Sequence, residues 1–331
     1  MNNQIKIAGR TFEVLDALNN VTLADSFVKN KTGTGHGEGK LYVGNENERT
    51  FQFFDDLNRE FFFVKSDFDK YLLDAKAEFE NPQQEYVRKE TMSEKFVELT
   101  ERLHGYSEYV LSFKLKRSGV MPPRVYLTSD SEYYDFMRAA GLPNISYLSF
   151  LKLKNLKNQS ISYYCRIFID YKSDIVKYES PLEVEAEKAI ENNTKMPDER
   201  KEQLMKARLG QGEYRRKLLE DCPFCPFTMV NDERLLIASH IKPWVKSDDT
   251  EKIDPKNGFA LTPTFDKLFD GGFITFTEDK KLLVSPFISP MNQNRLSIHD
   301  GLIIRKLPLD EKRWNYLQYH RENVFKGNIE E

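Results

Sequence analysis

Two short apolar runs followed by a capped helix restrict the fold of this chain more than any other sequence feature. The first run, R-L-L-I-A-S-H-I at 234–241, predicts a strand that stops at His240. After a charged loop, N-G-F-A-L at 257–261 predicts a second strand. The helix P-T-F-D-K-L-F-D follows, with Thr262 as its N-cap and Pro263 at its first position. The order strand, loop, strand, helix predicts a compact unit with a polar strand end beside one helix.

Four polar residues of this unit have the chemistry of a hydrolytic site. His240 ends the first strand, Asn257 opens the second, and Asp266 and Asp270 lie four residues apart on the helix. That spacing puts both carboxylates on one helix face, one turn apart. Carboxylate oxygens suit Mg²⁺ or Mn²⁺. A neutral histidine beside such an ion can take a proton from water, while the ion stabilises an oxygen that leaves a phosphodiester.

These segments resemble the HNH endonucleases, and in particular the branch found at the C-terminus of restriction-type nucleases. The resemblance rests on A-S-H-I-K-P-W, N-G-F-A-L-T-P-T-F-D-K-L-F-D-G-G-F-I and the flanks G-Q-G-E-Y-R-R-K-L-L and Y-L-Q-Y-H-R-E-N-V-F. It covers roughly residues 203–326 and does not extend to the first 170 residues. It implies a ββα-metal fold.

The resemblance also implies a role for each polar residue. His240 is expected to be the general base, and Asn257 to tie the loop so that the histidine is aimed. Asp266 occupies the position of the final metal ligand, and Asp270 that of a further ligand, although Asp270 could simply end the helix. Ser239 stands where the family usually has an Asp or His ligand. A serine hydroxyl is a poorer ligand, so we expect weak metal affinity in the absence of DNA.

The whole chain is predicted to be an α+β protein with two domains. Residues 1–172 predict a mixed α/β domain for DNA recognition or sensing, 173–205 an acidic helical linker, and 206–331 the ββα-metal nuclease domain. The first domain is predicted to contain helices at 67–80, 92–104 and 131–141 and strands at 109–116, 123–128, 147–154 and 161–170. The nuclease domain is predicted to open with a short helix at 207–221.

Positive charge is concentrated in one segment, although the chain has a net charge of −3. Residues 107–172 hold 10 Lys and Arg against 5 Asp and Glu. A continuous cationic face would bind DNA phosphates, but alternating lysines also mark the solvated face of any antiparallel sheet. The predicted DNA contacts are Lys114, Lys116, Arg117, Arg124, Lys152, Lys154 and Arg166 in this segment, and Arg215 on the helix that opens the nuclease domain.

Cysteine usage favours a reducing, cytoplasmic location. The chain has three cysteines, too few for a disulfide framework. The N-terminus lacks the apolar segment of a signal peptide, and no run of ~18 apolar residues predicts a membrane span. Cys222 and Cys225 form C-x-x-C without a second pair, so we do not expect structural zinc.

The sequence therefore predicts a metal-dependent DNA endonuclease that leaves 5′-phosphate and 3′-hydroxyl ends, with a role in restriction or phage defence. Double-stranded DNA is the expected partner. A single site of this kind cuts one strand, so a homodimer is expected for a double-strand break. Three alternatives stay open: a modification-dependent restriction nuclease, a ligand-activated defence nuclease, and a non-catalytic DNA-binding protein with a decayed site.

Overall fold

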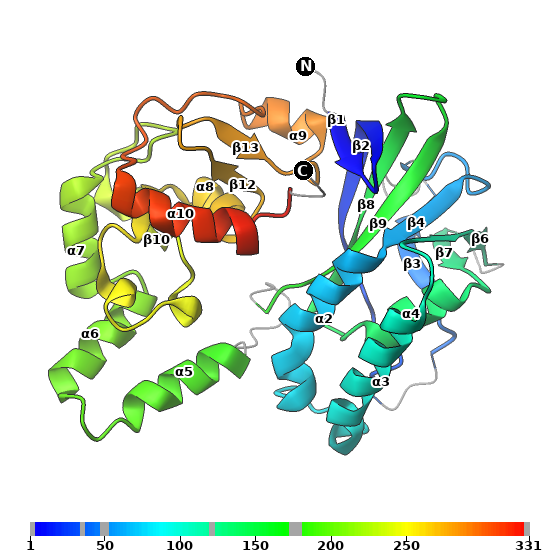
Figure 1. Ribbon diagram of the computed structural model, residues 1–331, viewed down its shortest axis with the longest axis horizontal. Helices are drawn as coiled ribbons and strands as arrows, with labels where there is room; N and C mark the ends of the chain where they lie inside the picture. The colour runs from blue at the N-terminus through cyan, green and yellow to red at the C-terminus, as the bar shows by residue number, and fades with distance from the viewer. Residues whose placement is uncertain (1–3, 34–36, 47–52, 119–122, 172–180, 328–331) are drawn as a thin grey trace. The chain divides into compact units, whose positions relative to one another are not determined.

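In the computed structural model the chain forms two compact units, Met1–Leu182 and Glu183–Asn328 (Figure 1). The structure describes residues 4–33, 37–46, 53–118, 123–171 and 181–327. Within these ranges, none of the helices has the length and apolar character needed to cross a bilayer. The boundary at Leu182 divides the segment 173–205, for which the sequence predicts a linker, between the two units.

A six-stranded mixed sheet forms the centre of the first unit. Its strand order is β1-β2-β8-β9-β4-β5, and every neighbouring pair is antiparallel except β9 and β4. The strands are β1 (Gln4–Ile7), β2 (Arg10–Thr22), β4 (Glu60–Val64), β5 (Val110–Phe113), β8 (Ser146–Asn155) and β9 (Ile161–Ile169). The long hairpin β8-β9 corresponds to the predicted strands at 147–154 and 161–170.

A second sheet of three strands includes Lys116, which the sequence assigns to the predicted strand at 109–116. It consists of β3 (Leu41–Asn45), β7 (Arg124–Thr128) and β6 (Lys116–Arg117), in the order β3-β7-β6. The prediction of one strand at 109–116 is therefore wrong. Strand β5 ends at Phe113 in the large sheet, and Lys116 pairs with Thr128 in the small one.

Three helices of the first unit lie close to their predicted positions and are grouped together in Figure 1. They are α2 (Lys65–Glu80), α3 (Met92–Gly105) and α4 (Glu132–Ala140), with a short 3₁₀ turn η1 (Lys89–Thr91) before α3. Phe63 of β4 packs on Phe68 of α2 with ring centroids 4.9 Å apart. Phe61, two residues earlier on the same face of β4, stacks on Tyr163 of the neighbouring strand β9 at 4.7 Å. The main core lies between the sheet and these helices.

The second unit begins with three helices, α5 (Pro181–Glu191), α6 (Asp198–Arg208) and α7 (Gly212–Asp221). The prediction of a single helix at 207–221 is wrong, because α6 ends at Arg208 and α7 begins only at Gly212. Gly210 and Gly212 adopt φ of 61° and 65°, a left-handed conformation that favours glycine and ends a helix. Helix α6 packs inside this unit, since Trp244 donates its Nε1–H to the Leu204 carbonyl at 3.2 Å.

The predicted strand, loop, strand, helix order is present in the second unit. Strand β10 (Ile237–His240) pairs antiparallel with β11 (Gly258–Leu261), and α8 (Pro263–Asp270) packs against both. Strand β10 starts three residues later than predicted, because η2 (Glu233–Leu235) forms a 3₁₀ turn first. The loop between the strands contains η3 (Trp244–Lys246) and η4 (Glu251–Ile253).

The remaining elements enclose this ββα unit. They are the hairpin β12 (Ile274–Phe276) with β13 (Leu282–Val284), and the helices α9 (Pro290–Arg295) and α10 (Glu311–Asn323). Phe259 of β11, Phe269 of α8 and Phe276 of β12 contact one another with centroids 5.8 to 6.0 Å apart. This aromatic centre fixes the helix against the strands.

Candidate active site

His240 lies at the end of β10 and is held by an aromatic neighbour. Its ring stacks on Tyr214 of α7, with centroids 4.3 Å apart and planes 8° apart. Gly258 is the register partner of His240, and a Cβ atom at Gly258 would overlap the Tyr214 hydroxyl and Leu218. Glycine at 258 therefore gives Tyr214 the space to reach the histidine. The sequence analysis did not single out Tyr214, although it lies within the matched flank G-Q-G-E-Y-R-R-K-L-L.

A backbone carbonyl fixes the orientation of the His240 ring within the plane of the stack. Its Nε2 lies 3.0 Å from the Lys252 carbonyl oxygen, in the loop between the strands. A carbonyl oxygen only accepts, so the neutral ring carries its proton on Nε2. Nδ1 is then the nitrogen with the lone pair, the one that can accept a proton. The Lys252 carbonyl could not be found from sequence, because a main-chain group carries no residue signal.

Asn257 is fully buried and ties this loop into a fixed shape. Its Oδ1 accepts from the Lys242 N–H at 2.8 Å, and its Nδ2 donates to the carbonyls of Lys242 and Glu251 and to Ser247 Oγ at 3.1 to 3.2 Å. The Asn257 carbonyl accepts from the Tyr214 hydroxyl at 3.1 Å. Asn257 therefore links Tyr214 to the loop from which Lys252 holds the histidine.

The two aspartates lie on α8, the helix that packs against β10. Asp266 is half-buried in the first turn, and Asp270 is exposed at the last residue. Ser239, next to His240, is 5% exposed and pairs with Phe259. The described residues contain no group of three or more His, Cys, Asp or Glu side chains arranged to hold a metal ion. A divalent cation at Asp266 and Asp270 would therefore need water or phosphate oxygens to complete its shell.

Cys222 and Cys225 contribute to the packing around this unit. Both are buried. The Cys222 sulfur accepts from the Ala260 N–H at 3.4 Å, and the Cys225 sulfur lies 3.7 Å from Thr262 Oγ1. These contacts attach the end of α7 to β11 and to the N-cap of α8.

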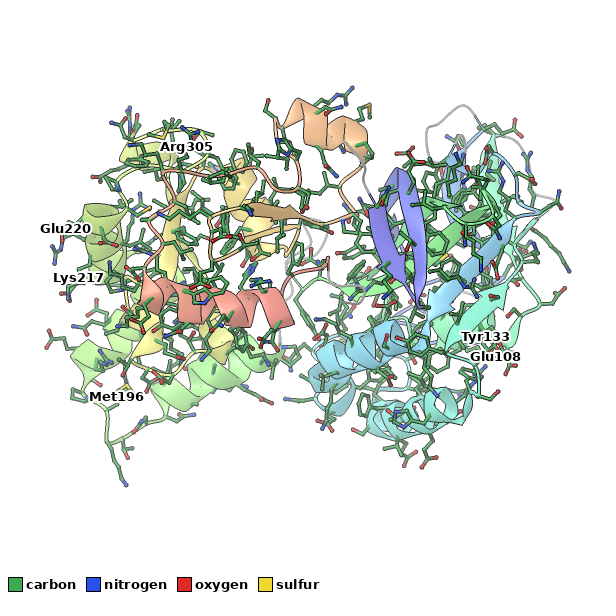
Figure 2. The ribbon with its side chains drawn as sticks, turned by 45° about the horizontal axis from the view of Figure 1, so that its top comes forward. Glu108, Tyr133, Met196, Lys217, Glu220 and Arg305 are labelled. Carbon is green, nitrogen blue, oxygen red and sulfur yellow. The ribbon has the colours of Figure 1, made fainter. Side chains whose placement is uncertain are left out.

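Arg215 braces the entry to β10. Its guanidinium donates to the carbonyls of Leu236 at 3.0 Å and Glu233 at 2.6 Å. Other charged residues of α7 pair within the helix, whereas Asp221 pairs with Lys256 and Arg313. Lys217 pairs with Glu213 at 2.9 Å, and Figure 2 shows Lys217 and Glu220 at its surface. Arg215 thus has a structural role here, which leaves its predicted DNA contact as a proposal.

The cationic face predicted for the first unit stays a prediction. Its residues are divided between the two sheets, with Lys152 and Lys154 on β8 and Lys116, Arg117 and Arg124 on β6 and β7. The side-chain partners found are Asn58 O for Lys114, Asp130 for Lys116, Glu46 for Arg117 and Asp55 for Lys152.

Arg166 does not fit a DNA contact and is removed from the predicted set. It is 4% exposed, and its Nε lies 3.2 Å from Asp67. Its guanidinium also lies 4.9 Å from the centre of the Phe168 ring. The prediction failed because the alternation of a strand does not tell which of its two faces is covered when both carry apolar residues.

We expect Tyr214 to be a positioning residue for His240. Tyr214→Phe keeps the stacked ring and should retain activity within ~3-fold, with a stability cost of ~1 kcal/mol for the lost hydroxyl. Tyr214→Leu removes the flat surface and should lower kcat at least ~10-fold, because small displacements of a reacting group are costly. Steady-state cleavage kinetics well below each variant's melting temperature, with KM unchanged, distinguish this from unfolding. Equal loss of kcat in both variants would contradict the stacking role.

His320 of α10 should make the second unit sensitive to acid. Its Nε2–H donates to the Phe269 carbonyl, its Nδ1 accepts from Thr275 Oγ1, both at 3.0 Å, and burial lowers its pKa to about 4. In the unfolded chain the His320 ring binds a second proton below about pH 6.5, whereas in the folded chain it binds that proton only below about pH 4. The contribution, at most about 3 kcal/mol, is therefore present above pH 6.5 and lost as the pH falls through this window.

Urea unfolding between pH 7 and pH 4 tests this expectation. The free energy of unfolding should fall less steeply with pH in His320→Gln than in the natural protein. A His299→Gln variant provides the matched control, because His299 lies at the surface, where its Nδ1 contacts the Asp300 carbonyl. If all three proteins have the same slope, His320 does not titrate as described.

The comparisons with known proteins concern only the second unit. Residues 225–277 match the family model described as HNH endonuclease. This segment contains His240, Asn257, Asp266 and Asp270. No curated protein matches the chain. Over residues 225–277, the second unit of this chain is therefore similar to the HNH endonuclease family.

Proposed function

We propose that this chain is a metal-dependent DNA endonuclease, with its active centre at the end of β10. The observation that carries the proposal is the fixation of His240 between Tyr214 and the Lys252 carbonyl, which leaves Nδ1 as the proton acceptor. The family match over 225–277 supports a nuclease of this type.

The chemistry proposed is hydrolysis of one phosphodiester bond. His240 Nδ1 takes a proton from water as the water oxygen attacks phosphorus in line with the leaving 3′ oxygen. The new P–O bond forms as the P–O3′ bond breaks, which gives a 5′-phosphate and, after protonation by solvent, a 3′-hydroxyl. The imidazolium formed on His240 keeps its Nε2–H bond to the Lys252 carbonyl, which holds the ring in place. Asp266 and Asp270 would hold the cation, whose positive charge offsets the charge on the leaving oxygen.

Restriction or phage defence is the proposed biological role, with the first unit selecting the DNA. A homodimer would bring two such centres to the two strands of a duplex. A non-catalytic DNA-binding protein is the second candidate. It is favoured by Ser239 at a position where the family usually supplies a metal ligand, and by the small number of ligating side chains around α8.

Digestion of methylated and unmethylated genomic DNA with Mg²⁺, Mn²⁺, Ni²⁺ or EDTA tests the proposal. We expect cleavage with a divalent cation and none with EDTA, and sequenced ends that carry 5′-phosphates. Cleavage restricted to methylated DNA would assign the modification-dependent version of the same activity. Binding of DNA without cleavage in every cation would contradict the proposed enzyme and support the non-catalytic reading.

A further inference from the structure

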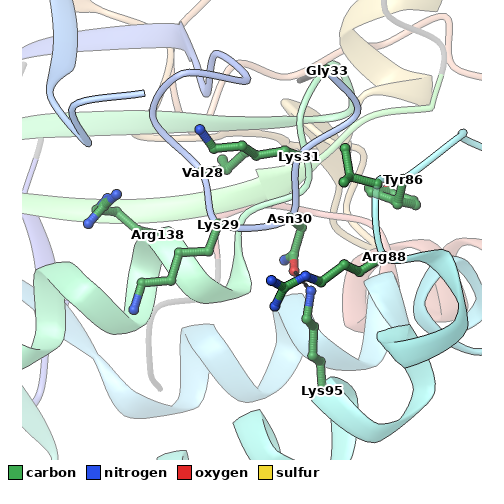
Figure 3. Close-up of a pocket in the computed structure, with 10 residues that line it drawn as sticks. Val28, Lys29, Asn30, Lys31, Gly33, Tyr86, Arg88, Lys95 and Arg138 are labelled. Atoms are coloured by element: carbon green, nitrogen blue, oxygen red, sulfur yellow. Dashed lines mark hydrogen bonds between the residues drawn. The ribbon is translucent and has the colours of Figure 1, made fainter. Parts of the chain in front are cut away.

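A cationic cavity of about 600 Å³ lies in the first unit, separate from every residue discussed above as catalytic. Its basic side chains come from three segments: Lys29 and Lys31 from the chain after β2, Arg88 and Lys95 from the chain around η1 and α3, and Arg138 from α4. Figure 3 shows Arg88 and Lys95 extending toward one another beside Asn30. Five positive side chains around one hollow create a strong preference for an anion.

Only part of this positive charge is neutralised by the protein. Asp135 lies 2.6 Å from Lys29 and 3.9 Å from Arg138, at one end of the cavity. At the other end, no carboxylate of the described residues lies within 4.0 Å of the nitrogens of Arg88 or Lys95. Burial, and after it the positive charge of Arg88, lower the pKa of Lys95. The positive charges of Arg88 and Lys95 repel each other, Glu98 and Glu90 offset part of this repulsion at Lys95, and an anion between the two cations would relieve the rest.

The wall of the cavity is built in advance rather than formed by loose surface side chains. Asn30 is 2% exposed. Its Nδ2 donates to the carbonyls of Ala139 at 2.7 Å and Gly141 at 3.2 Å, and its Oδ1 accepts from Lys95 Nζ at 3.2 Å. A buried amide thus holds the Lys95 ammonium at the wall.

Main-chain bonds hold the three segments together. The Lys29 N–H donates to the Arg138 carbonyl at 2.9 Å, and the Val87 N–H donates to the Lys31 carbonyl at 2.8 Å. Arg138 Nε also donates to the Phe27 carbonyl at 3.0 Å. A cavity whose cations are already positioned loses little conformational entropy when it binds a ligand.

We propose that this cavity binds a small phosphorylated ligand of the nucleotide class. Its volume lies within the ~300–1,000 Å³ typical of small-molecule sites. Arginine and lysine are the side chains best suited to phosphate oxygens. Val87, which is exposed, adds apolar surface to the lining, against which a ring can pack. The proposal rests on the first unit alone and does not depend on the nuclease activity of the second.

The test is isothermal titration of the full chain with ATP, GTP, pyrophosphate, adenosine and a short DNA duplex, all in EDTA so that no cleavage occurs. The variant is the double substitution Arg88→Gln and Lys95→Gln. Lys76→Gln is the matched control, because Lys76 lies on α2 of the same unit, pairs with Glu80 at 3.6 Å and does not line the cavity. Thermal melting of all three proteins establishes that they are folded.

We expect ATP or GTP to bind more tightly than pyrophosphate and adenosine, since only the nucleotides have both the phosphate groups and the base. The double variant should weaken that binding at least ~10-fold, as expected when charge-assisted bonds are lost, while Lys76→Gln changes it less than ~2-fold. The proposal is overturned if no nucleotide binds, if pyrophosphate binds as tightly as the nucleotides, or if only binding to the duplex is weakened by the double variant. Should the double variant fail to fold, Arg88→Gln alone decides, because Arg88 is exposed.

Discussion

Replacing His240 with alanine is expected to lower DNA cleavage by ~10²–10⁴-fold, the usual contribution of a general base. The reason is specific to one atom. Because Nε2 lies within hydrogen-bond distance of the Lys252 carbonyl, Nδ1 is the ring atom that we expect to take the proton from water. Single-turnover cleavage of a supercoiled plasmid measures the loss. DNA binding should stay within ~3-fold of the natural protein, since the neutral ring contributes no charge to phosphate contacts.

Two controls sharpen this prediction. His299→Ala removes a surface histidine of the same unit and should leave the cleavage rate unchanged. Added imidazole should partly restore cleavage in His240→Ala, because the space left by the ring lies beside Tyr214. A His240→Ala protein that is folded and cuts at the natural rate would remove the histidine from the mechanism.

The second large effect is expected at Asp266. Asp266→Asn keeps the shape of the side chain but removes the charge that would hold the cation, which is worth several kcal/mol in the transition state. We expect a loss of ~100-fold or more at low Mn²⁺, partly recovered at high Mn²⁺. Plasmid cleavage across a range of Mn²⁺ concentrations measures both features.

Asp270→Asn and Asp279→Asn are the comparison variants for Asp266→Asn. Asp270 is exposed at the end of α8, and Asp279 is exposed in the turn between β12 and β13. A smaller shift in Mn²⁺ dependence for Asp270→Asn would make it a secondary ligand, whereas Asp279→Asn should behave as the natural protein. If Asp266→Asn leaves the Mn²⁺ dependence unaltered, the cation is held elsewhere.

Sequence was sufficient where a local signal decides the structure. Helix α8 spans 263–270 as predicted, because its boundaries are local: Thr262 precedes it, Pro263 opens it and Gly271 follows it. The long strands β8 and β9 were found because each has nine or more residues with strong strand preference.

The parts of the fold that the sequence did not predict depend on pairing with residues far along the chain. The prediction omitted β1, β2, β3 and β4, which are mostly paired with strands far along the chain, such as β2 with β8. Residues 109–116 alternate like one strand, but 110–113 pair in the large sheet and Lys116 pairs in the small one. Local propensity carries no information on such a choice, because it is decided by the packing of the finished unit.

The same difference between local signals and tertiary contacts applies to the candidate site. Spacing was enough to nominate His240 and Asn257. The features that hold the ring, a stack on Tyr214 and a bond to the Lys252 carbonyl, arise from a folded loop and from a helix that begins 28 residues before β10 ends. Arg166 was misassigned because its ion pair with Asp67 joins β9 to α2. Contacts of this kind exist only once the tertiary structure is formed.

The central claim is that His240 and Asp266 face one divalent cation. The direct measurement is the broadening of histidine ring signals by Mn²⁺ in ¹³C-histidine-labelled protein with a short DNA duplex, where His240 is assigned by its absence in His240→Ala. We predict that Mn²⁺ broadens the His240 signal in the natural protein and leaves it sharp in Asp266→Asn at the same concentration. A His240 signal that stays sharp in the natural protein while Mn²⁺ supports cleavage, or that broadens equally in both proteins, would contradict the claim.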